Sequence, residues 1–311
     1  MERRSFVKAL GAAALFSNAG LSNSAFAQQD TSTTDVDSTF TLNYAPHLGH
    51  FEHSAGSDIV KQIQFAAAQG FRGWEENFMA SRPLEEQKRI GRALVQHGMQ
   101  MGVFISGMQK DFWEKRPVLS SGDKDIENAF LSLIDKQSDT ARYINARWTT
   151  VVPGFLDPKL PMGFQTSNMI SLLNRACDIF EQKGIIMVLE PLNTRIDHPG
   201  VYLQTVSQAH ALCSAINRPQ CKILFDIYHE QIESGNLIPT IDNAWEHIAY
   251  FQVGDTPGRK EPTTGEINYK NVFSHIYQKG YEGLIGMEHG KSISGIEGER
   301  ALINAYRAVD P

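Results

Sequence analysis

Cysteine is scarce in this sequence. Only Cys177, Cys213 and Cys221 occur among 311 residues, and no two of them have the C-x-x-C spacing of a zinc or redox motif. An odd set of three fits neither a disulfide framework nor a zinc cluster. We therefore expect buried thiols, with a Cys213–Cys221 disulfide as the alternative.

A basic excess and long apolar runs are also missing. The chain has 29 basic and 35 acidic residues, a formal net charge of −6, so it lacks the positive charge with which proteins bind a nucleic-acid backbone. After the first 27 residues no stretch reaches the roughly 20 apolar residues that cross a bilayer. The 41% hydrophobic content is typical of globular proteins. We expect no nucleic-acid partner and no stable membrane anchor.

The N-terminus carries a targeting pattern. Arg3 and Arg4 precede a short apolar run at 9–16, and AFA at 25–27 forms an A-x-A cleavage site. Paired arginines indicate the twin-arginine export machinery as a partner. A membrane anchor is the alternative, but this apolar run is too short to span a bilayer. We predict a cleaved twin-arginine signal over residues 1–27 and a periplasmic protein.

The remaining chain divides into two parts. Without residues 1–27, which hold three basic and one acidic residue, 284 residues remain with a formal charge of −8. Residues 28–38 are polar and lack aromatics, which predicts a flexible lead-in. Residues 39–311 are expected to form one domain. Because twin-arginine export carries folded proteins, this domain would take up its cofactor before export.

One unit repeats along residues 39–311. Short β-branched or apolar runs alternate with segments of helical periodicity, and several of these segments end at a glycine. The eight expected strands lie at 41–44, 70–74, 101–105, 148–152, 185–189, 222–225, 249–253 and 284–287. This spacing predicts a (β/α)8 TIM barrel. A doubly wound sheet would normally carry a glycine-rich turn after its first strand, and none occurs there.

The longest interval lies between the third and fourth expected strands. It contains residues 108–128, which we interpret as an enlarged loop at the catalytic face, where it could act as a lid. Trp113 in this loop either covers substrate or anchors the loop to the barrel.

Polar residues close the last four expected strands. The C-terminal ends of barrel strands converge on one mouth, so the side chains there would face a common centre. Three carboxylates in a partly dry cavity need a counter-charge, and oxygen ligands suit Mg²⁺, Mn²⁺ or Co²⁺. The pattern predicts one divalent-metal site, unless each residue merely closes its strand or pairs with a basic neighbour. The four residues are Glu190, Asp226, Gln252 and Glu288.

The same residue types suit proton transfer beside a carbonyl group. Such a transfer needs an electrophile, a base and an acid. A metal would act as the electrophile, and Glu190 and Glu288 would act as the base and the acid. Arg259 offers a fork of donors for a carboxylate or a hydroxyl pair. His229 would orient a substrate oxygen, or else is satisfied by the backbone.

Three histidines occur at a spacing of three near the N-terminus. His47, His50 and His53 would share a face only in a helix, whereas Pro46 and Gly49 favour a loop. We therefore do not expect a second metal site. His47, at the end of the first strand, is the candidate to line the pocket.

Several stretches carry a resemblance to a known family. The chain resembles the hydroxypyruvate isomerase family, within the xylose isomerase-like barrel superfamily, in VLEPLN (188–193), FDIYHEQIESGNL (225–237), FQVGDTPGRKEPTTGEINY (251–269) and GYEGLIGMEHG (280–290). In the first half, GFRGWEENF (70–78) is similar to the family's second strand, with Glu75 at its acidic position. NYAPHLGHF (43–51) departs from the usual first strand.

The resemblance implies roles for single residues. The four strand-end residues fall on the family's metal ligands, and Glu190 and Glu288 also fall on its acid/base pair. His229 and Arg259 match positions that hold substrate oxygens, and Glu75 is a further candidate for substrate contact. Glu261 and Glu266 belong to the same motif, where they contribute to the site or fix the loop.

The leading hypothesis is a metal-dependent isomerase of a small hydroxyketone. The nominal reaction of the family converts hydroxypyruvate to tartronate semialdehyde through an enediolate. A ketose epimerase, or a keto-sugar dehydratase or lyase, is the alternative on the same metal site. An exported sugar-acid binding protein without turnover is an alternative of another class. An endonuclease IV-type nuclease is opposed by the charge of −8. Such barrels often form homo-oligomers, but no stretch of this sequence identifies an interface.

Overall fold

Eight short strands run through the part of the chain that the structure, a computed structural model, describes, residues 39–311. Each overlaps the segment predicted for it. They are β1 (Asn43–Ala45), β2 (Gly73–Trp74), β3 (Gln100–Met101), β4 (Trp148–Val151), β5 (Ile186–Leu189), β6 (Cys221–Asp226), β7 (Ile248–Gln252) and β8 (Leu284–Gly286). The predicted signal, 1–27, and lead-in, 28–38, lie outside the described residues.

The strands form a closed parallel ring. Six of them pair in the order β1-β8-β7-β6-β5-β4, and β2 pairs with β3. Parallel bridges between His47 and Glu75 and between Ile105 and Thr150 join the two sheets at both edges. The fold of residues 39–311 is therefore a TIM-barrel-like α/β fold, as the sequence predicts.

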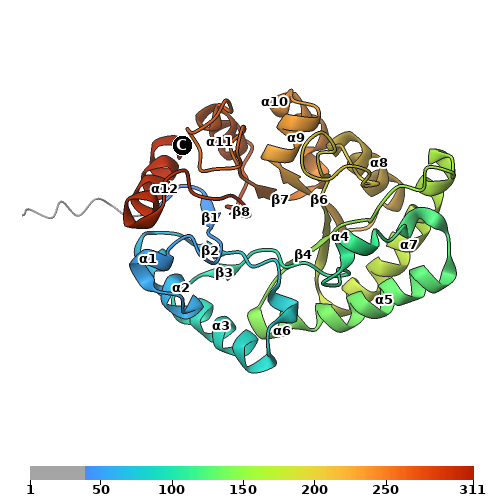
Figure 1. Ribbon diagram of the computed structural model, residues 1–311, viewed down its shortest axis with the longest axis horizontal. Coiled ribbons are helices and arrows are strands. Elements are labelled where there is room, and N and C mark those ends of the chain that lie inside the picture. The colour runs from blue at the N-terminus through green and yellow to red at the C-terminus, as the bar shows by residue number, and fades with distance from the viewer. Residues whose placement is uncertain (1–38) are drawn as a thin grey trace, which may run out of the picture. The chain divides into compact units, whose positions relative to one another are not determined.

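Helices follow the strands and surround the ring (Figure 1). The longer ones are α2 (Ile59–Ala68), α3 (Leu84–Gln96), α5 (Lys124–Ser138), α7 (Met162–Lys183), α8 (Val206–Ile216), α10 (Leu237–Ala244), α11 (Tyr269–Gln278) and α12 (Gly295–Val309). The short ones are α1 (Glu52–Ala55), α4 (Phe112–Lys115), α6 (Thr140–Ile144), α9 (Ile227–Glu233) and the 3₁₀ turns η1 (Met79–Ser81), η2 (Leu119–Ser121) and η3 (Trp245–His247). Among the helices of residues 39–311, none has the length and apolar character needed to cross a membrane.

Glycine ends helices where the sequence predicts. Gly70, Gly98, Gly184 and Gly280 have φ angles of 94°, 64°, 67° and 77°. This is the left-handed region that glycine enters without a steric penalty. Each glycine turns the chain from a helix back towards the next strand.

Side chains that alternate in direction along the strands form two separate apolar clusters. Val188, Leu224, Tyr250 and Leu284 belong to a small cluster of buried residues inside the ring. Their strand neighbours, such as Met187 and Leu189, belong to the large cluster between strands and helices. Because side chains alternate with a period of two, every second residue beyond these four also faces the interior of the ring.

Two local predictions have definite outcomes. The three cysteines are free and buried, as predicted. The sulfur atoms of Cys213 and Cys221 lie 3.8 Å apart, in contact but not in a disulfide bond. Residues 108–128 are not a plain loop, because they contain α4, η2 and the first turn of α5.

Candidate metal and substrate site

The period-two alternation brings the predicted ligands to one mouth. Glu190 and Asp226 stand two residues beyond Val188 and Leu224, and Gln252 stands two beyond Tyr250, so all three follow the inner face of the ring. They are almost completely buried, at 6%, 2% and 1% exposure. Glu288 lies two residues past the end of β8 and is partly exposed.

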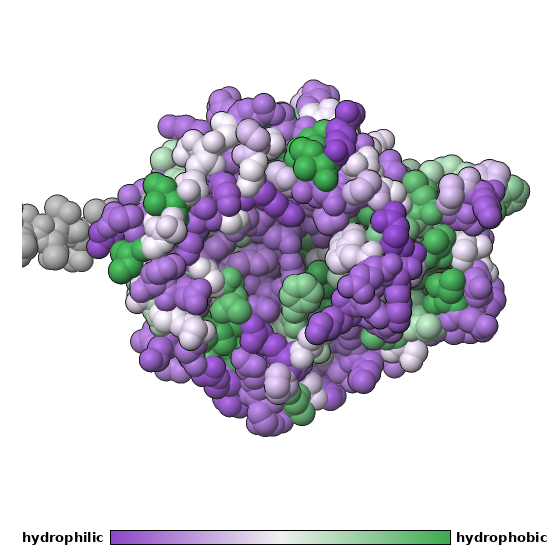
Figure 2. All heavy atoms as spheres, in the orientation of Figure 1, coloured by the Kyte–Doolittle hydropathy of each residue, from purple (hydrophilic) through white to green (hydrophobic). Residues whose placement is uncertain are grey.

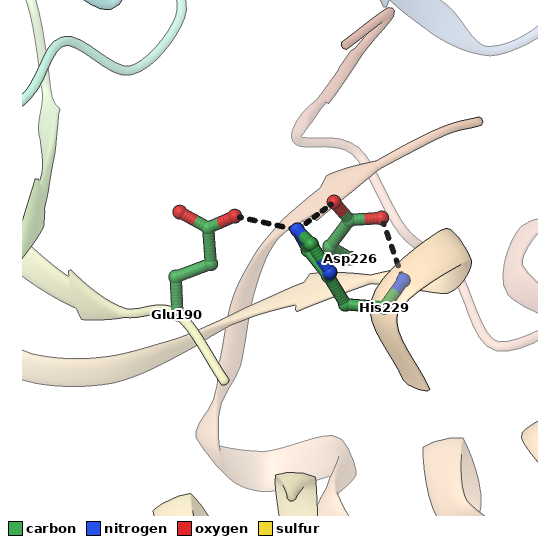
Figure 3. Close-up of side chains that lie close together, drawn as sticks. All are labelled: Glu190, Asp226 and His229. Carbon is green, nitrogen blue, oxygen red and sulfur yellow. Dashed lines mark hydrogen bonds and ion pairs between the residues drawn. The ribbon is translucent and has the colours of Figure 1, made fainter. Parts of the chain in front are cut away.

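Asp226 is held by the helix that follows it. It is the N-cap of α9, where its Oδ1 accepts a hydrogen bond from the backbone N–H of Tyr228 at 2.8 Å. Its Oδ2 is left to face the mouth. This strand-to-helix turn also places His229 in the first turn of α9, so that Glu190, Asp226 and His229 each bring one ligand atom within 4.8 Å of the others (Figure 3).

Hydrogen bonds fix the tautomer of His229. Asn193 Oδ1 accepts from the backbone N–H groups of Ile196 and Asp197, which directs its amide nitrogen to His229 Nδ1 at 2.7 Å. Nδ1 is therefore an acceptor, and Nε2 carries the proton. Burial, followed by the Arg259 charge, lowers the pKa of His229 well below its ordinary value. The ring is neutral, and its Nε2 lies 3.9 Å from Glu190 Oε1 and 3.6 Å from Asp226 Oδ2, beyond hydrogen-bond distance of either. This N–H therefore suits a substrate oxygen better than a metal ion.

Glu75 fixes the orientation of the Gln252 amide. Glu75 is fully buried, and its carboxylate accepts from Gln252 Nε2 at 2.8 Å and from the Tyr250 hydroxyl at 2.6 Å. Because a carboxylate only accepts, the amide nitrogen must face Glu75. Gln252 Oε1 then faces away from it and, within residues 39–311, is buried without a hydrogen-bond partner.

Arg259 joins two of the carboxylates. Its Nη2 donates to Asp226 Oδ2 at 2.9 Å and to Glu288 Oε2 at 2.8 Å. Asn77 Nδ2 donates to the other oxygen of Glu288 at 2.6 Å. Glu288 is thus positioned from two sides, whereas the Glu190 carboxylate accepts no hydrogen bond from the described residues.

The site is crowded with negative charge. Burial raises the pKa of Glu190 well above its ordinary value, and the Glu288 and Asp226 carboxylates add to this effect. Burial also raises the pKa of Asp226, against the opposing effect of Arg259. One arginine therefore leaves the carboxylates incompletely compensated.

This donor set fits a divalent cation. A buried amide oxygen without a partner is rare, and Gln252 Oε1 is such an atom beside two buried carboxylates. Oxygen donors with excess negative charge are the ligands that hard divalent ions take. The residues that would hold the ion are Glu190, Asp226, Gln252 and Glu288.

A cavity of about 450 Å³ opens beside this cluster, lined by His47, Asn77, Arg259 and Glu288 among others. Figure 2 shows one face of the molecule hollowed at its centre, with hydrophilic surface in the hollow and hydrophobic patches on its rim. The cavity thus lies between Glu288 and the end of β1, where His47 stands.

Comparison with known proteins places this chain in a family. Residues 63–307 match the family described as xylose isomerase-like TIM barrel. A 2-oxo-tetronate isomerase from Cupriavidus necator is 35% identical over 232 residues, 74% of this chain and 86% of that protein. The hydroxypyruvate isomerase of Escherichia coli is 28% identical over 258 residues, 80% and 92% of the two chains. The chain belongs to the hydroxypyruvate isomerase family of xylose isomerase-like barrels.

Two further comparisons show how far the similarity extends. The matches to the human, mouse and Xenopus putative hydroxypyruvate isomerases cover about half of each of those proteins. Among solved structures, an AP endonuclease of family 2 from Brucella melitensis superposes with a TM-score of 0.72 at 25% identity, over 85% of this chain and 99% of that chain. The xylose isomerase-like barrel is therefore shared by proteins with different names, and its curated relatives above are isomerases.

Glu75 and His47, the two first-half candidates for substrate contact, lie against each other. Glu75 is enclosed by protein donors, and His47 Nε2 contacts Glu75 Oε1 at 2.5 Å. Although burial opposes a charge on this ring, the Glu75 carboxylate raises the pKa of His47. His47 still lines the cavity, whereas the contacts of Glu75 support the orientation of Gln252.

The other two histidines of the N-terminal trio have separate partners. His50 Nε2 contacts the His289 carbonyl at 2.8 Å, and the backbone N–H of His53 donates to Glu299 at 2.7 Å. The three rings therefore do not converge on one centre.

The two remaining glutamates of the family motif contact their own surroundings. Glu261 is buried and accepts a hydrogen bond from the backbone N–H of Ser292 at 2.8 Å. Glu266 accepts from Gln231 Nε2 at 3.3 Å. Both contacts support a role in fixing the loop.

Sequence reasoning missed four side chains of the site. Asn77, Asn193 and Tyr250 contact its predicted members directly, and His198 stacks on Trp113 with ring centroids 4.6 Å apart. Tyr250 could have been found, because it lies two residues before Gln252 on the same strand face. The other three lie in loops, where no periodicity predicts the direction of a side chain.

Proposed function

We propose that this protein is a divalent-metal-dependent isomerase of a small hydroxyketone, with hydroxypyruvate as the nominal substrate of the family. The observation that carries the proposal is the pair formed by Glu190 and Glu288 at one mouth. Glu190 is buried and free of hydrogen-bond donors, whereas Glu288 is held by Asn77 and Arg259. Two carboxylates in such different environments suit a base and an acid.

Glu190, Asp226, Gln252 and Glu288 would hold the divalent ion, which when bound would supply the positive charge that favours enolisation of the substrate. Arg259 binds the substrate carboxylate or a hydroxyl pair through its planar fork. His229 donates its Nε2 proton in a hydrogen bond to a substrate oxygen. The ring keeps this orientation because Asn193 occupies its other nitrogen.

The two glutamates move the carbon-bound proton. One of them removes a proton from the hydroxyl-bearing carbon, and the electron pair forms the double bond of an enediolate. The other returns a proton to the neighbouring carbon, while the hydroxyl proton passes to the former carbonyl oxygen. Hydroxypyruvate becomes tartronate semialdehyde with no net gain or loss of atoms or electrons.

Proton NMR in D₂O tests this proposal. Purified protein is mixed with hydroxypyruvate and Mn²⁺ or Mg²⁺, and the controls are EDTA-treated protein and Glu288→Gln. Metal-dependent conversion that is lost in both controls is the expected result. Conversion at the spontaneous rate in every sample contradicts hydroxypyruvate as the substrate.

A second candidate substrate is 2-oxo-tetronate. It is favoured by the Cupriavidus necator relative of that name, which is 35% identical over 86% of its own length. The same NMR experiment with 2-oxo-tetronate distinguishes the two substrates. Epimerisation or dehydration of a keto sugar would start from the same proton abstraction and would give a different product spectrum.

The proposed setting is the periplasm, reached by twin-arginine export. The support is the N-terminal sequence alone, with Arg3 and Arg4 before a short apolar run. The partners are then a small hydroxyketone or keto-sugar substrate and the export machinery. A homo-oligomer remains a proposal from the resemblance to the family.

A further inference from the structure

A second cavity adjoins the proposed catalytic centre. It has a volume of about 490 Å³ and lies over the ends of β2 and β3. We name it the β2–β3 annex, defined by Phe78, Ile105, Met108, Lys110, Trp113 and Gln137. We propose that the annex binds the distal part of a neutral, sugar-sized substrate, so that the molecule turned over is longer than a three-carbon acid. This inference rests on the proposed function.

The annex is continuous with the site through two residues. Asn77 lines both the annex and the cavity of Glu288, and its amide donates to Glu288 at 2.6 Å. On the other side, Trp113 stacks on His198, whose ring centroid lies 5.4 Å from that of His229. A molecule whose reacting carbons lie between Glu190 and Glu288 can therefore extend into the annex.

The candidate metal ligands all lie on one side of the mouth, and the annex lies on the other. All four stand on or just after β5 to β8, whereas the annex is built by the segments after β2 and β3. The reacting carbons of a substrate would occupy the ligand side. A longer chain or ring would extend from there towards Phe78, which follows Asn77 in the sequence and lines the annex.

The walls of the annex fit the C–H face of a neutral group. Phe78 is 64% exposed and Trp113 is 40% exposed, and large apolar rings at the surface of a cavity are typical of ligand contact. Lys110 is the one charged side chain among the residues that line the annex. A phosphate group takes several charge-assisted donors, so we favour an uncharged distal group.

Contacts among its own walls hold the shape of the annex. Gln137 accepts from the backbone N–H of Gly107 at 2.7 Å and donates to the Met108 carbonyl at 3.1 Å. Phe112 packs on Phe155 with ring centroids 5.9 Å apart. Because these contacts hold the segment of α4 in place, little conformational entropy is lost when a ligand binds.

Deuterium exchange with probes of different length tests the inference. The full-length protein with Mn²⁺ is incubated in D₂O with hydroxypyruvate, with D-fructose as a neutral six-carbon ketose, and with fructose 6-phosphate as its charged counterpart. NMR follows exchange of the proton beside the carbonyl. We expect kcat/KM for exchange of the neutral ketose to exceed that of hydroxypyruvate by about tenfold, the gain from covering one apolar ring.

Two variants locate the effect. Phe78→Ala should lower the ratio of ketose to hydroxypyruvate exchange by about tenfold. Phe164→Ala is the matched control, because this phenylalanine is also 64% exposed and lies on α7 outside the annex. It should leave the ratio unchanged.

The outcomes separate this inference from the proposed function. The proposal that the annex binds substrate is overturned if hydroxypyruvate exchanges faster than the neutral ketose. It is also overturned if Phe78→Ala slows the exchange of both probes equally. Faster exchange of fructose 6-phosphate than of D-fructose contradicts the proposal that the distal group is uncharged. If no probe exchanges, the proposed function fails. Saturation-transfer NMR then measures whether the ketose binds to the annex. Ketose binding that weakens in Phe78→Ala retains the annex, and the absence of ketose binding overturns it.

Discussion

At the scale of single residues, the proposed base or acid Glu190 has an unfavourable effect on the stability of the folded chain. Its buried carboxylate lies near Glu288 and Asp226, and its pKa is raised above the ordinary value of 4.5. The folded chain therefore holds this proton more tightly than the unfolded chain. The free energy of unfolding of the metal-free protein must then fall as the pH rises from the ordinary pKa through the raised one.

Glu190→Gln should stabilise the metal-free protein at neutral pH. We expect a gain of about 0.5–2 kcal/mol in the free energy of unfolding, because a buried like charge is removed, and the gain should shrink as the pH is lowered towards 4.5. Urea unfolding in EDTA across this pH range measures it. Added Mn²⁺ should stabilise the unsubstituted protein by mass action and Glu190→Gln much less.

Glu282→Gln is the control, since Glu282 is an exposed glutamate. It should change neither the stability nor its pH dependence. A metal-free Glu190→Gln that is less stable than the unsubstituted protein would contradict the electrostatic argument.

Glu75 should control metal affinity without touching the metal. Its hydrogen bond from Gln252 Nε2 turns Gln252 Oε1 towards the site. Glu75→Gln removes the strict acceptor and allows the Gln252 amide to flip, so Mn²⁺ affinity should fall by about 10–100-fold, as for other residues that orient metal ligands. Isothermal titration calorimetry measures this change independently of turnover.

Two further variants make the test specific. Combining Glu75→Gln with Gln252→Glu exchanges donor and acceptor and should restore most of the affinity. Glu76→Gln, next along the chain, changes a glutamate that pairs with Arg82 and should leave Mn²⁺ affinity unchanged. If Mn²⁺ affinity falls equally in Glu75→Gln, in the double variant and in Glu76→Gln, the loss comes from replacing a buried glutamate and not from the orientation of the Gln252 amide.

At the scale of elements, one glycine fixes the segment that carries α4 and η2. Gly154 has φ +81°, and a side chain there would collide with the Pro117 carbonyl. Gly154→Ala should therefore lower the free energy of unfolding by about 1–3 kcal/mol. Gly163→Ala in α7, where nothing lies within 4 Å, is the control without an expected loss. Urea unfolding of both proteins checks this, and an unaffected Gly154→Ala would mean that the segment is free to shift.

At the scale of the whole molecule, export is the property to test. Replacing Arg3 and Arg4 together by lysine keeps the charge and removes the twin-arginine pair, so the protein should remain in the cytoplasm with residues 1–27 uncleaved. Cell fractionation and mass spectrometry of the N-terminus measure both effects. Lys8→Arg keeps the pair and should be exported. Periplasmic protein from the double variant would exclude the twin-arginine route.

The sequence by itself determined the barrel and the strand ends. Short apolar runs, glycine stops and a regular spacing are local patterns, and a strand of period two fixes which residues share a face. Val188 and Leu224 inside the ring therefore predict Glu190 and Asp226 at its mouth. These statements need only neighbouring residues.

Only the tertiary structure decided which polar groups meet. Asn77 reaches Glu288 across 211 positions, and Glu75 reaches Gln252 across 177. Trp113 meets His198 because α4, inside a segment predicted as a loop, packs over the mouth. Such contacts arise when the ring closes and brings distant loops together, and no periodicity within one segment encodes them. The sequence thus determined which residues face the centre, and ring closure decided how their hydrogen bonds orient them there.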